Sequence, residues 1–156
     1  MDIGQIAPDF TLPTANASEE NDEIILSNLR GNIVVLFFYP KDMTPGCTTE
    51  AIAFSALKKE FDAHSAKIIG ISKDSVARHN KFIAKHDLNI TLVADEEGVA
   101  CEAYEVWVLK KLYGREYMGI ERSTYLISAD GKIAKIWRKV RVKGHAETVL
   151  ESVKTL

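Results

Sequence analysis

The run IVVLFFY, residues 33–39, is the stretch of sequence that decides the fold. It consists of β-branched, aliphatic and aromatic residues without a polar position, which is the pattern of a strand buried on both faces. We therefore expect this strand at the centre of a sheet. The run is also far too short to cross a bilayer, and we expect no membrane partner.

The sequence after this run predicts a helix over about 45–64. Thr44 offers a polar N-cap, and Pro45 then occupies the first helical position, where proline is well tolerated. Apolar residues recur behind it at helical spacing, namely Phe54, Leu57 and Phe61. A buried strand that leads into a helix is the first half of a βαβ unit.

The rest of the chain continues this alternation. We predict strands at 67–72, 91–93, 124–127 and 133–137, and helices at 75–86, 97–104 and 145–153. Asp130 and Gly131 mark a hairpin between the last two strands. Short apolar segments at 10–12 and 24–26 flank a polar, acidic stretch, 14–23, which we expect to be a mobile connection.

This order of elements predicts the fold class. A βαβ unit, an extra helix, a hairpin and a final helix are typical of an α/β fold, specifically a thioredoxin-like three-layer sandwich with a central mixed β-sheet and flanking helices. The chain has 156 residues, of which 46% are hydrophobic and 27% charged, as in ordinary globular proteins. We expect a single domain over residues 1–156.

Charge and terminal sequence exclude further classes of function. The chain mixes 20 basic and 22 acidic residues for a net charge of -2, so it has no basic stripe for a phosphate backbone and we expect no nucleic-acid partner. The first residues lack the charged and apolar segments of a signal peptide. We therefore expect a cytoplasmic protein.

Cysteine usage leaves a redox or catalytic role open. The chain has two cysteines, Cys47 and Cys101, which are too few for a disulfide scaffold and lack the paired spacing of a zinc site. The histidines form no metal-binding pattern, and we expect all of them to be exposed on helices or loops: His64, His79, His86 and His145. We predict no metal, haem or flavin cofactor.

The segment 39–50 carries the chemistry because it leads from the buried strand into the first helix. Cys47 falls in the first turn of that helix, where free backbone N–H groups and the helix dipole favour the thiolate over the thiol. The tetrad Thr44 to Cys47 occupies the place of a Cys-x-x-Cys motif, with a hydroxyl in place of its first thiol. Thr44 and Cys47 cannot cycle between a dithiol and a disulfide, which favours a peroxidase over a thiol-disulfide exchange protein.

Pro40, Thr44 and Cys47 match the peroxiredoxin motif Pro-x-x-x-Thr-x-x-Cys. The wider sequence resembles the bacterioferritin comigratory protein, or peroxiredoxin Q, subfamily. The resemblance covers nearly the whole chain and is carried in matching order by residues 7–10, 70–72, 106–107, 113–120, 122–124 and 130–132.

The resemblance implies a role for each site residue. Cys47 is the peroxidatic nucleophile, Thr44 and Arg122 donate hydrogen bonds to the reacting oxygens, and Pro40 shields the thiolate. In support, Gly46 lets the backbone approach the peroxide closely, while Glu50 orients Arg122 or only complements the helix dipole.

Simpler interpretations of these residues stay open at this point. Cys47 alone is compatible with a buried inert thiol, and Thr44 with a plain N-cap. Arg122 is compatible with an ion pair on the strand surface, with Glu121 or Glu50 as its partner.

The resemblance also implies a second thiol, which this chain lacks at the usual positions. Many members of the subfamily carry a resolving cysteine five residues after the first, where this chain has Ile52. Others carry it in the following helix, where this chain offers only Phe82, Ile83 and Ala84. Cys101 lies 54 positions after Cys47 and is a candidate resolving thiol only if the two Cα atoms come within about 7 Å.

Our prediction is therefore a thiol peroxidase with a one-cysteine cycle. Cys47 reduces hydrogen peroxide or an alkyl hydroperoxide, becomes a sulfenic acid, and is restored by thioredoxin or by glutathione with glutaredoxin. The alternatives are a two-cysteine cycle with Cys101 resolving, and a redox-responsive thiol-disulfide or binding module. The subfamily resemblance implies a monomer.

Overall fold

The strand predicted from the apolar run does lie inside the main sheet. A computed structural model describes residues 1–15 and 22–156. Strand β3, Ile33–Phe38, pairs in parallel with β4, Ala66–Ser72, and antiparallel with β8, Ser123–Ile127. Val34 through Phe38 are all buried, as a strand covered on both faces requires.

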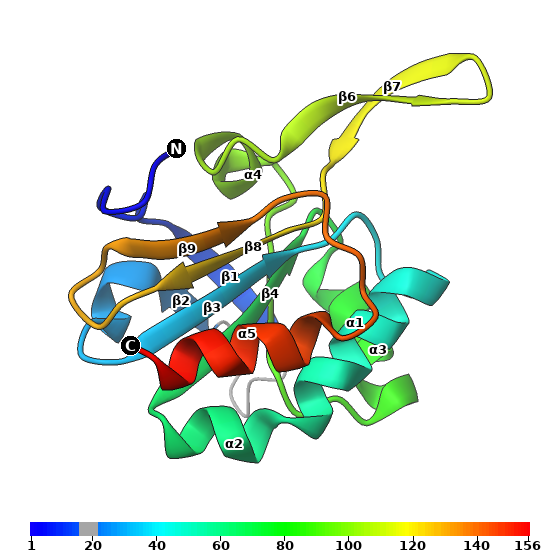
Figure 1. Ribbon diagram of the computed structural model, residues 1–156. Helices are drawn as coiled ribbons and strands as arrows, with labels where there is room; N and C mark the ends of the chain where they lie inside the picture. The colour runs from blue at the N-terminus through cyan, green and yellow to red at the C-terminus, as the bar shows by residue number, and fades with distance from the viewer. Residues whose placement is uncertain (16–21) are drawn as a thin grey trace.

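The main sheet is mixed, as predicted. Over the described residues its strands follow the order β2-β1-β5-β4-β3-β8-β9 (Figure 1). Besides β3, β4 and β8, the sheet contains β1, Thr11–Ala15, β2, Glu23–Ile25, β5, Thr91–Ala94, and β9, Ile133–Trp137. β3, β4 and β5 run in parallel, whereas β1, β2, β8 and β9 join by antiparallel pairing.

Helices cover both faces of this sheet (Figure 1). One face carries α1, Pro45–Ala56, α2, Lys58–Ala63, α3, Val76–His86, and α5, His145–Lys154. The other face carries the 3-10 helix η1, Leu26–Leu29, and α4, Val99–Ala103. The three layers confirm the predicted thioredoxin-like sandwich. Within 1–15 and 22–156, none of the helices has the length and apolar character that spanning a membrane requires.

The two cores follow from the alternation of side chains along β3. Phe37 faces the α1 side and stacks on Phe54 with ring centroids 4.8 Å apart. Phe38 faces the opposite side and packs on Tyr104, with ring centroids 5.3 Å apart. Residues on opposite faces of the sheet therefore belong to separate clusters, and the two cysteines belong to different ones.

The first helix differs from its prediction. Instead of one helix over 45–64, the chain forms α1 and α2, which meet at Leu57, a residue with φ -99° and ψ 4°. These angles end the α1 hydrogen-bond series, so the chain turns before α2 begins. Phe61 of α2 still packs against Phe54 of α1, with ring centroids 6.0 Å apart.

A second hairpin was not predicted. Strands β6, Trp107–Leu112, and β7, Arg115–Ile120, pair antiparallel and project from the body of the molecule (Figure 1). Both turn residues, Tyr113 and Gly114, have positive φ, at 49° and 76°. Tyrosine is unusual in such a turn, and much of the hairpin is exposed, so neither the turn signal nor an apolar alternation marks it in the sequence.

The predicted mobile connection over 14–23 falls largely outside the described residues, which omit 16–21. At its two ends the prediction is wrong, because Thr14 belongs to β1 and Glu23 to β2. The Thr14 amide also donates to the carbonyl of Asp22 at 3.0 Å. Strand pairing therefore extends further into the polar stretch than its composition suggests.

Gly70 in β4 offers a test of side-chain packing over adjacent strands of the sheet. A Cβ at this position would lie 2.7 Å from both Leu92 Cδ2 and Phe37 Cζ. Both of these side chains are 0% exposed and have no free space to move into. We expect Gly70→Ala to lower the free energy of unfolding in urea by about 1–3 kcal/mol. An unchanged free energy would contradict this packing.

Candidate active site

Cys47 lies in the first turn of α1, as predicted. Thr44 is the N-cap and Pro45 the first helical residue. The first intrahelical bond runs from the Thr48 amide to the Thr44 carbonyl, at 2.9 Å. The amides of Gly46 and Cys47 therefore precede the intrahelical bonds and remain available to an anion. The Cys47 side chain is only 1% exposed.

Arg122 joins the Cys47 sulfur to a buried carboxylate. Its Nη2 donates to Cys47 Sγ at 3.4 Å, and its Nη1 donates to Glu50 Oε1 at 2.8 Å. Arg122 immediately precedes β8, whose pairing with β3 brings it beside the start of α1. Arg122 does form the ion pair with Glu50 that the simpler interpretation expects, but the same guanidinium also contacts the Cys47 sulfur.

Glu50 and Cys47 stabilise the positive charge of Arg122. Burial works against the charged guanidinium, but the neighbouring Glu50 and Cys47 more than offset it, so the pKa of Arg122 is raised. The Arg122 side chain is 17% exposed and that of Glu50 only 2%. An ion pair with this little solvent is screened far less than one on the surface.

The remaining predicted residues surround this group in different ways. The Thr44 hydroxyl donates to the Lys41 carbonyl at 2.8 Å and makes no cap bond to α1, so it is not a plain N-cap. A Cβ on Gly46 would lie 3.1 Å from Arg122 Nη2, so Gly46 provides room for the guanidinium. Pro40 is exposed, and its role in shielding the thiolate stays a prediction.

Two buried titratable groups lie beside Arg122. Burial raises the pKa of Glu50 from 4.5 to about 7, although the Arg122 guanidinium acts in the opposite direction. Glu50 Oε2 has no hydrogen-bond partner among the described residues. Burial, together with the charge of Arg122, lowers the pKa of His145 from 6.5 to about 4, and its Nε2 lies 2.8 Å from Thr124 Oγ1.

Glu50 is expected to make the stability of the protein depend on pH. The unfolded carboxyl titrates near 4.5, but the folded one keeps its proton up to about 7. Between these values the folded state binds more protons, so the free energy of unfolding falls as the pH rises, by up to about 1.4 kcal/mol per pH unit. Glu50→Gln lacks this titration.

The measurement is urea unfolding of both proteins at a series of pH values. We expect the stability of the unmodified protein relative to Glu50→Gln to be greatest below pH 4.5 and to decrease up to about pH 7. His145 acts in the opposite direction in both proteins, because stability is lost as the pH falls from 6.5 towards 4, and the comparison cancels it. If the difference in the free energy of unfolding between the two proteins stays constant from pH 4.5 to about 7, the raised pKa of Glu50 is contradicted.

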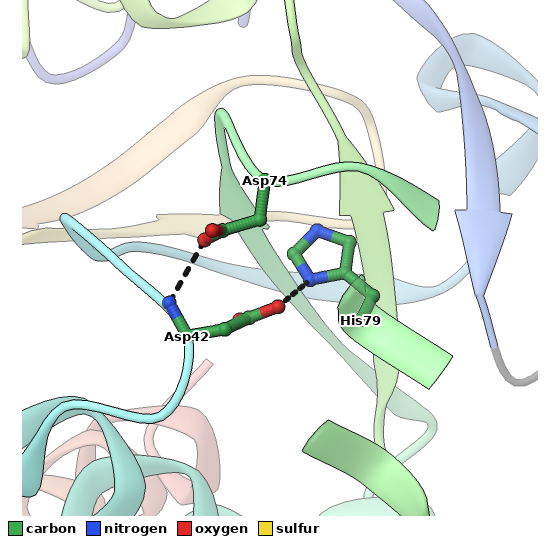
Figure 2. Close-up of side chains that lie close together, drawn as sticks. All are labelled: Asp42, Asp74 and His79. Atoms are coloured by element: carbon green, nitrogen blue, oxygen red, sulfur yellow. Dashed lines mark hydrogen bonds and ion pairs between the residues drawn. The ribbon is translucent and has the colours of Figure 1, made fainter. Parts of the chain in front are cut away.

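Sequence reasoning missed a cluster of polar residues behind the active-site loop. Asp42, Asp74, His79 and Tyr39 form what we call the Asp42 cluster, part of which Figure 2 shows. His79 is 0% exposed and His145 only 7%, so the prediction of exposed histidines is wrong for both. Each is buried because a polar partner on a neighbouring element satisfies its ring.

The Asp42 cluster has the residue types of a metal site, but its ligand atoms are already engaged. Asp42 accepts from Tyr39 and pairs with His79, while His79 Nε2 faces the Val93 carbonyl. Asp74 accepts from Ser72 and pairs with Arg78. A cation would have to displace all of these bonds, so the geometry fits a hydrogen-bonded cluster instead.

The structure separates the two cysteines. Cys101 belongs to α4 and to the buried cluster on the opposite face of the sheet from Cys47. It is 0% exposed, and its amide donates to Asp95 Oδ2 at 2.8 Å. Burial, with the hydrogen bond and charge of Asp95, raises the pKa of the Cys101 thiol far above its ordinary value. The thiolate needed for disulfide exchange is therefore strongly disfavoured there.

The other positions considered for a resolving thiol lie on the Cys47 side. Ile52 is on α1 and 45% exposed. Ala84 is exposed on α3, whereas Phe82 is buried in the core. Because the chain has no cysteine besides Cys47 and Cys101, none of these surfaces presents a second thiol.

Comparison with known proteins supports this architecture. The family model described as AhpC/TSA family matches residues 3–136. The Peroxiredoxin Bcp of Bacillus subtilis (strain 168) is 47% identical over 156 residues, which cover 100% of this chain and 97% of that protein. The Peroxiredoxin Bcp of Escherichia coli (strain K12) is 36% identical over 99% of this chain and 96% of its own length.

Solved structures agree with the sequence relatives. A structure of the Xanthomonas campestris bacterioferritin comigratory protein matches with a TM-score of 0.90 at 41% identity, covering 99% of this chain and 98% of that one. A PrxQ mutant from Xylella fastidiosa gives a TM-score of 0.92 at 37% identity, covering 99% and 96%. These matches confirm the thioredoxin-like fold and the resemblance found in the sequence.

Proposed function

The chain belongs to the AhpC/TSA family and is a peroxiredoxin, and we propose that it reduces hydrogen peroxide and organic hydroperoxides through Cys47 in a one-cysteine cycle. The observation that carries this proposal is the contact between Arg122 Nη2 and Cys47 Sγ at the start of α1. A guanidinium held against a sulfur stabilises the thiolate and directs a hydrogen-bond donor at the place where the peroxide must react.

The oxidation step needs only groups that surround the sulfur. The Cys47 thiolate attacks one peroxide oxygen, so that an S–O bond forms as the O–O bond breaks. The other oxygen leaves as hydroxide or alkoxide and takes up a proton to become water or an alcohol. Arg122 and the amides of Gly46 and Cys47 supply donors for the charge that develops on these oxygens, and the Thr44 hydroxyl adds another when its hydrogen turns from the Lys41 carbonyl to the peroxide.

The placement of Cys101 supports regeneration by an external thiol. A resolving role would require Cys101 to leave its buried position and pass to the other face of the sheet. An external thiol instead converts the sulfenic acid to a mixed disulfide with loss of water, and a second thiol releases reduced Cys47. We propose glutathione with glutaredoxin, or thioredoxin, as the source of these thiols.

The proposed substrate class rests partly on the relatives. The structure of the Xanthomonas campestris protein is described in terms of alkyl peroxide reduction. Its 41% identity over nearly the full chain supports the same substrate class here. A monomer stays our prediction for the oligomeric state, and sedimentation of the reduced protein would check it.

A steady-state assay tests the proposed function. Peroxide loss is measured with hydrogen peroxide or cumene hydroperoxide, in the presence of glutathione and glutaredoxin or of thioredoxin and its reductase. We expect continued turnover with at least one of these reductants and a single turnover without any. Reduction of insulin in place of peroxide would indicate a thiol-disulfide exchange protein and would contradict the proposal.

A further inference from the structure

The loop between β3 and α1 is fixed from behind by the Asp42 cluster. The Asp42 amide donates to Asp74 Oδ2 at 2.8 Å, and its Oδ2 lies 2.6 Å from His79 Nδ1 (Figure 2). Its Oδ1 accepts from the Tyr39 hydroxyl at 2.6 Å, and its carbonyl accepts from Arg78 Nη2 at 3.3 Å. One residue of the loop is thus bound to Tyr39, which directly follows β3, to α3 and to the connection that precedes α3.

The hydrogen-bond partners of His79 determine where the protons of the Asp42 cluster lie. The Val93 carbonyl can only accept, so His79 Nε2, at 3.0 Å, must carry a hydrogen. Nδ1 faces the Asp42 carboxylate, so one proton lies between these two groups. Both side chains are 0% exposed. Loss of either partner would leave the other buried and unpaired, which is far more destabilising than loss of a surface pair.

This anchoring acts on the residues that surround the Cys47 sulfur. Met43, directly after Asp42, has φ 68°, a conformation that a residue with a side chain keeps only when its surroundings enforce it. Thr44 follows, and its hydroxyl donates back to the Lys41 carbonyl. The position of the Thr44 hydroxyl and the start of α1 therefore depend on the bonds of Asp42.

Access to the sulfur requires movement of the residues around it. Cys47 is 1% exposed, and a thiol that attacks its sulfenic acid must approach the sulfur from the side opposite the S–O bond that breaks. Displacement of the loop would open this approach, whereas attack on peroxide needs the loop in place. The two half-reactions therefore make opposite demands on the loop.

We propose that the Asp42–His79 pair sets the balance between these two states. Asp42 and His79 are positioning residues for the reaction of Cys47, and their contacts are to the loop and not to the sulfur. This inference rests on the proposed function, since it assumes that Cys47 is oxidised by peroxide and restored by an external thiol. Weakening the pair should slow oxidation by peroxide and speed the reaction of Cys47 with bulky or thiol reagents.

Two substitutions of His79 each keep one of its two hydrogen bonds and remove the other. In His79→Asn the amide occupies the place of Nδ1 and keeps the bond to Asp42. In His79→Gln the amide occupies the place of Nε2 and keeps the bond to Val93 while losing Asp42. We expect His79→Gln to change both half-reactions and His79→Asn to stay close to the unmodified protein, because only the Asp42 bond acts on the loop.

The measurements are made in the Cys101→Ser background, so that Cys47 is the only thiol. Stopped-flow mixing with hydrogen peroxide gives the oxidation rate, and mixing of the preformed sulfenic acid with glutathione gives the rate of mixed-disulfide formation. Alkylation of reduced Cys47 by iodoacetamide reports exposure without any peroxide. For His79→Gln we expect slower oxidation, with mixed-disulfide formation and alkylation faster by about tenfold.

Two further variants separate this effect from general loss of stability. Tyr39→Phe removes one bond to Asp42 and should act in the same direction as His79→Gln, and more weakly. Tyr125→Phe removes a comparable buried hydroxyl, which donates to the Tyr104 carbonyl on the opposite face of the sheet, and should leave Cys47 alkylation unchanged. It serves as the matched control.

Several outcomes would overturn the inference. Equal effects of His79→Gln and His79→Asn would show that the Asp42 bond has no special role, as would alkylation that rises equally in Tyr125→Phe. A fall in both half-reactions would show a structural role only. If the unmodified protein fails to consume peroxide, the proposed function fails, while the alkylation rates still decide whether the Asp42–His79 pair controls access to Cys47.

Discussion

Replacement of Cys47 by serine is expected to lower peroxide consumption by more than about 1,000-fold, to the level of free thiol in the assay. A serine hydroxyl does not ionise beside Arg122 at neutral pH, and an alcohol cannot accept an oxygen atom from the peroxide as sulfur does. The measurement is the initial rate of hydrogen peroxide loss with a saturating reductant.

Cys101→Ser is the matched control for this substitution. Cys101 is buried on the other face of the sheet, so its loss should leave the rate within about twofold of the unmodified protein. Substantial activity in Cys47→Ser would exclude Cys47 as the nucleophile. Loss of turnover in Cys101→Ser, with the first oxidation intact, would instead assign the resolving step to Cys101.

The second large effect is expected at Arg122. Arg122→Met removes the donor to the Cys47 sulfur and should lower the rate of Cys47 oxidation by about 100- to 1,000-fold. Arg122→Lys restores the charge but not the two-pronged geometry, because one ammonium cannot hold both Cys47 and Glu50 as the guanidinium does. We expect Lys to recover only a small part of the loss, measured by stopped-flow oxidation.

Glu50 complicates this experiment and also provides its control. Arg122→Met leaves the buried Glu50 carboxyl without its partner, so part of the loss could come from local distortion. The double variant Glu50→Gln with Arg122→Met removes the unpartnered carboxyl and should be equally slow if the donor to sulfur is what matters. Recovery of the rate in the double variant would contradict the direct role of Arg122.

The main elements were predictable because their patterns are local. The run 33–39 has no polar position, and only a strand covered on both faces accommodates such a run, so β3 was placed correctly. Thr44 and Pro45 likewise mark the start of α1. The hairpin of β6 and β7 was missed because it is largely exposed and turns at Tyr113, so its residues carry little apolar alternation.

The candidate site was predictable only in part. Resemblance supplied Arg122, which lies 75 positions from Cys47, and no local pattern connects the two. His79 and Asp42 are 37 positions apart, and Asp42 lies in the loop after β3 whereas His79 lies on α3, which follows the adjacent parallel strand β4. Both segments lie at the edge of the sheet where β3 and β4 end. The polar residues that follow each strand were the only indication in the sequence that Asp42 and His79 could pair. Exposure was assumed for His79 because unpaired histidine is seldom buried, and the sequence does not show the partner.

The central claim is that Cys47 is oxidised alone and restored from outside. Intact mass and peptide mapping after one equivalent of hydrogen peroxide, with and without glutathione, test it most directly. We predict one added oxygen on the Cys47 peptide without glutathione, and a glutathione disulfide at Cys47 with it. A quantitative loss of two hydrogens, mapped to a Cys47–Cys101 disulfide within one chain, would contradict the account.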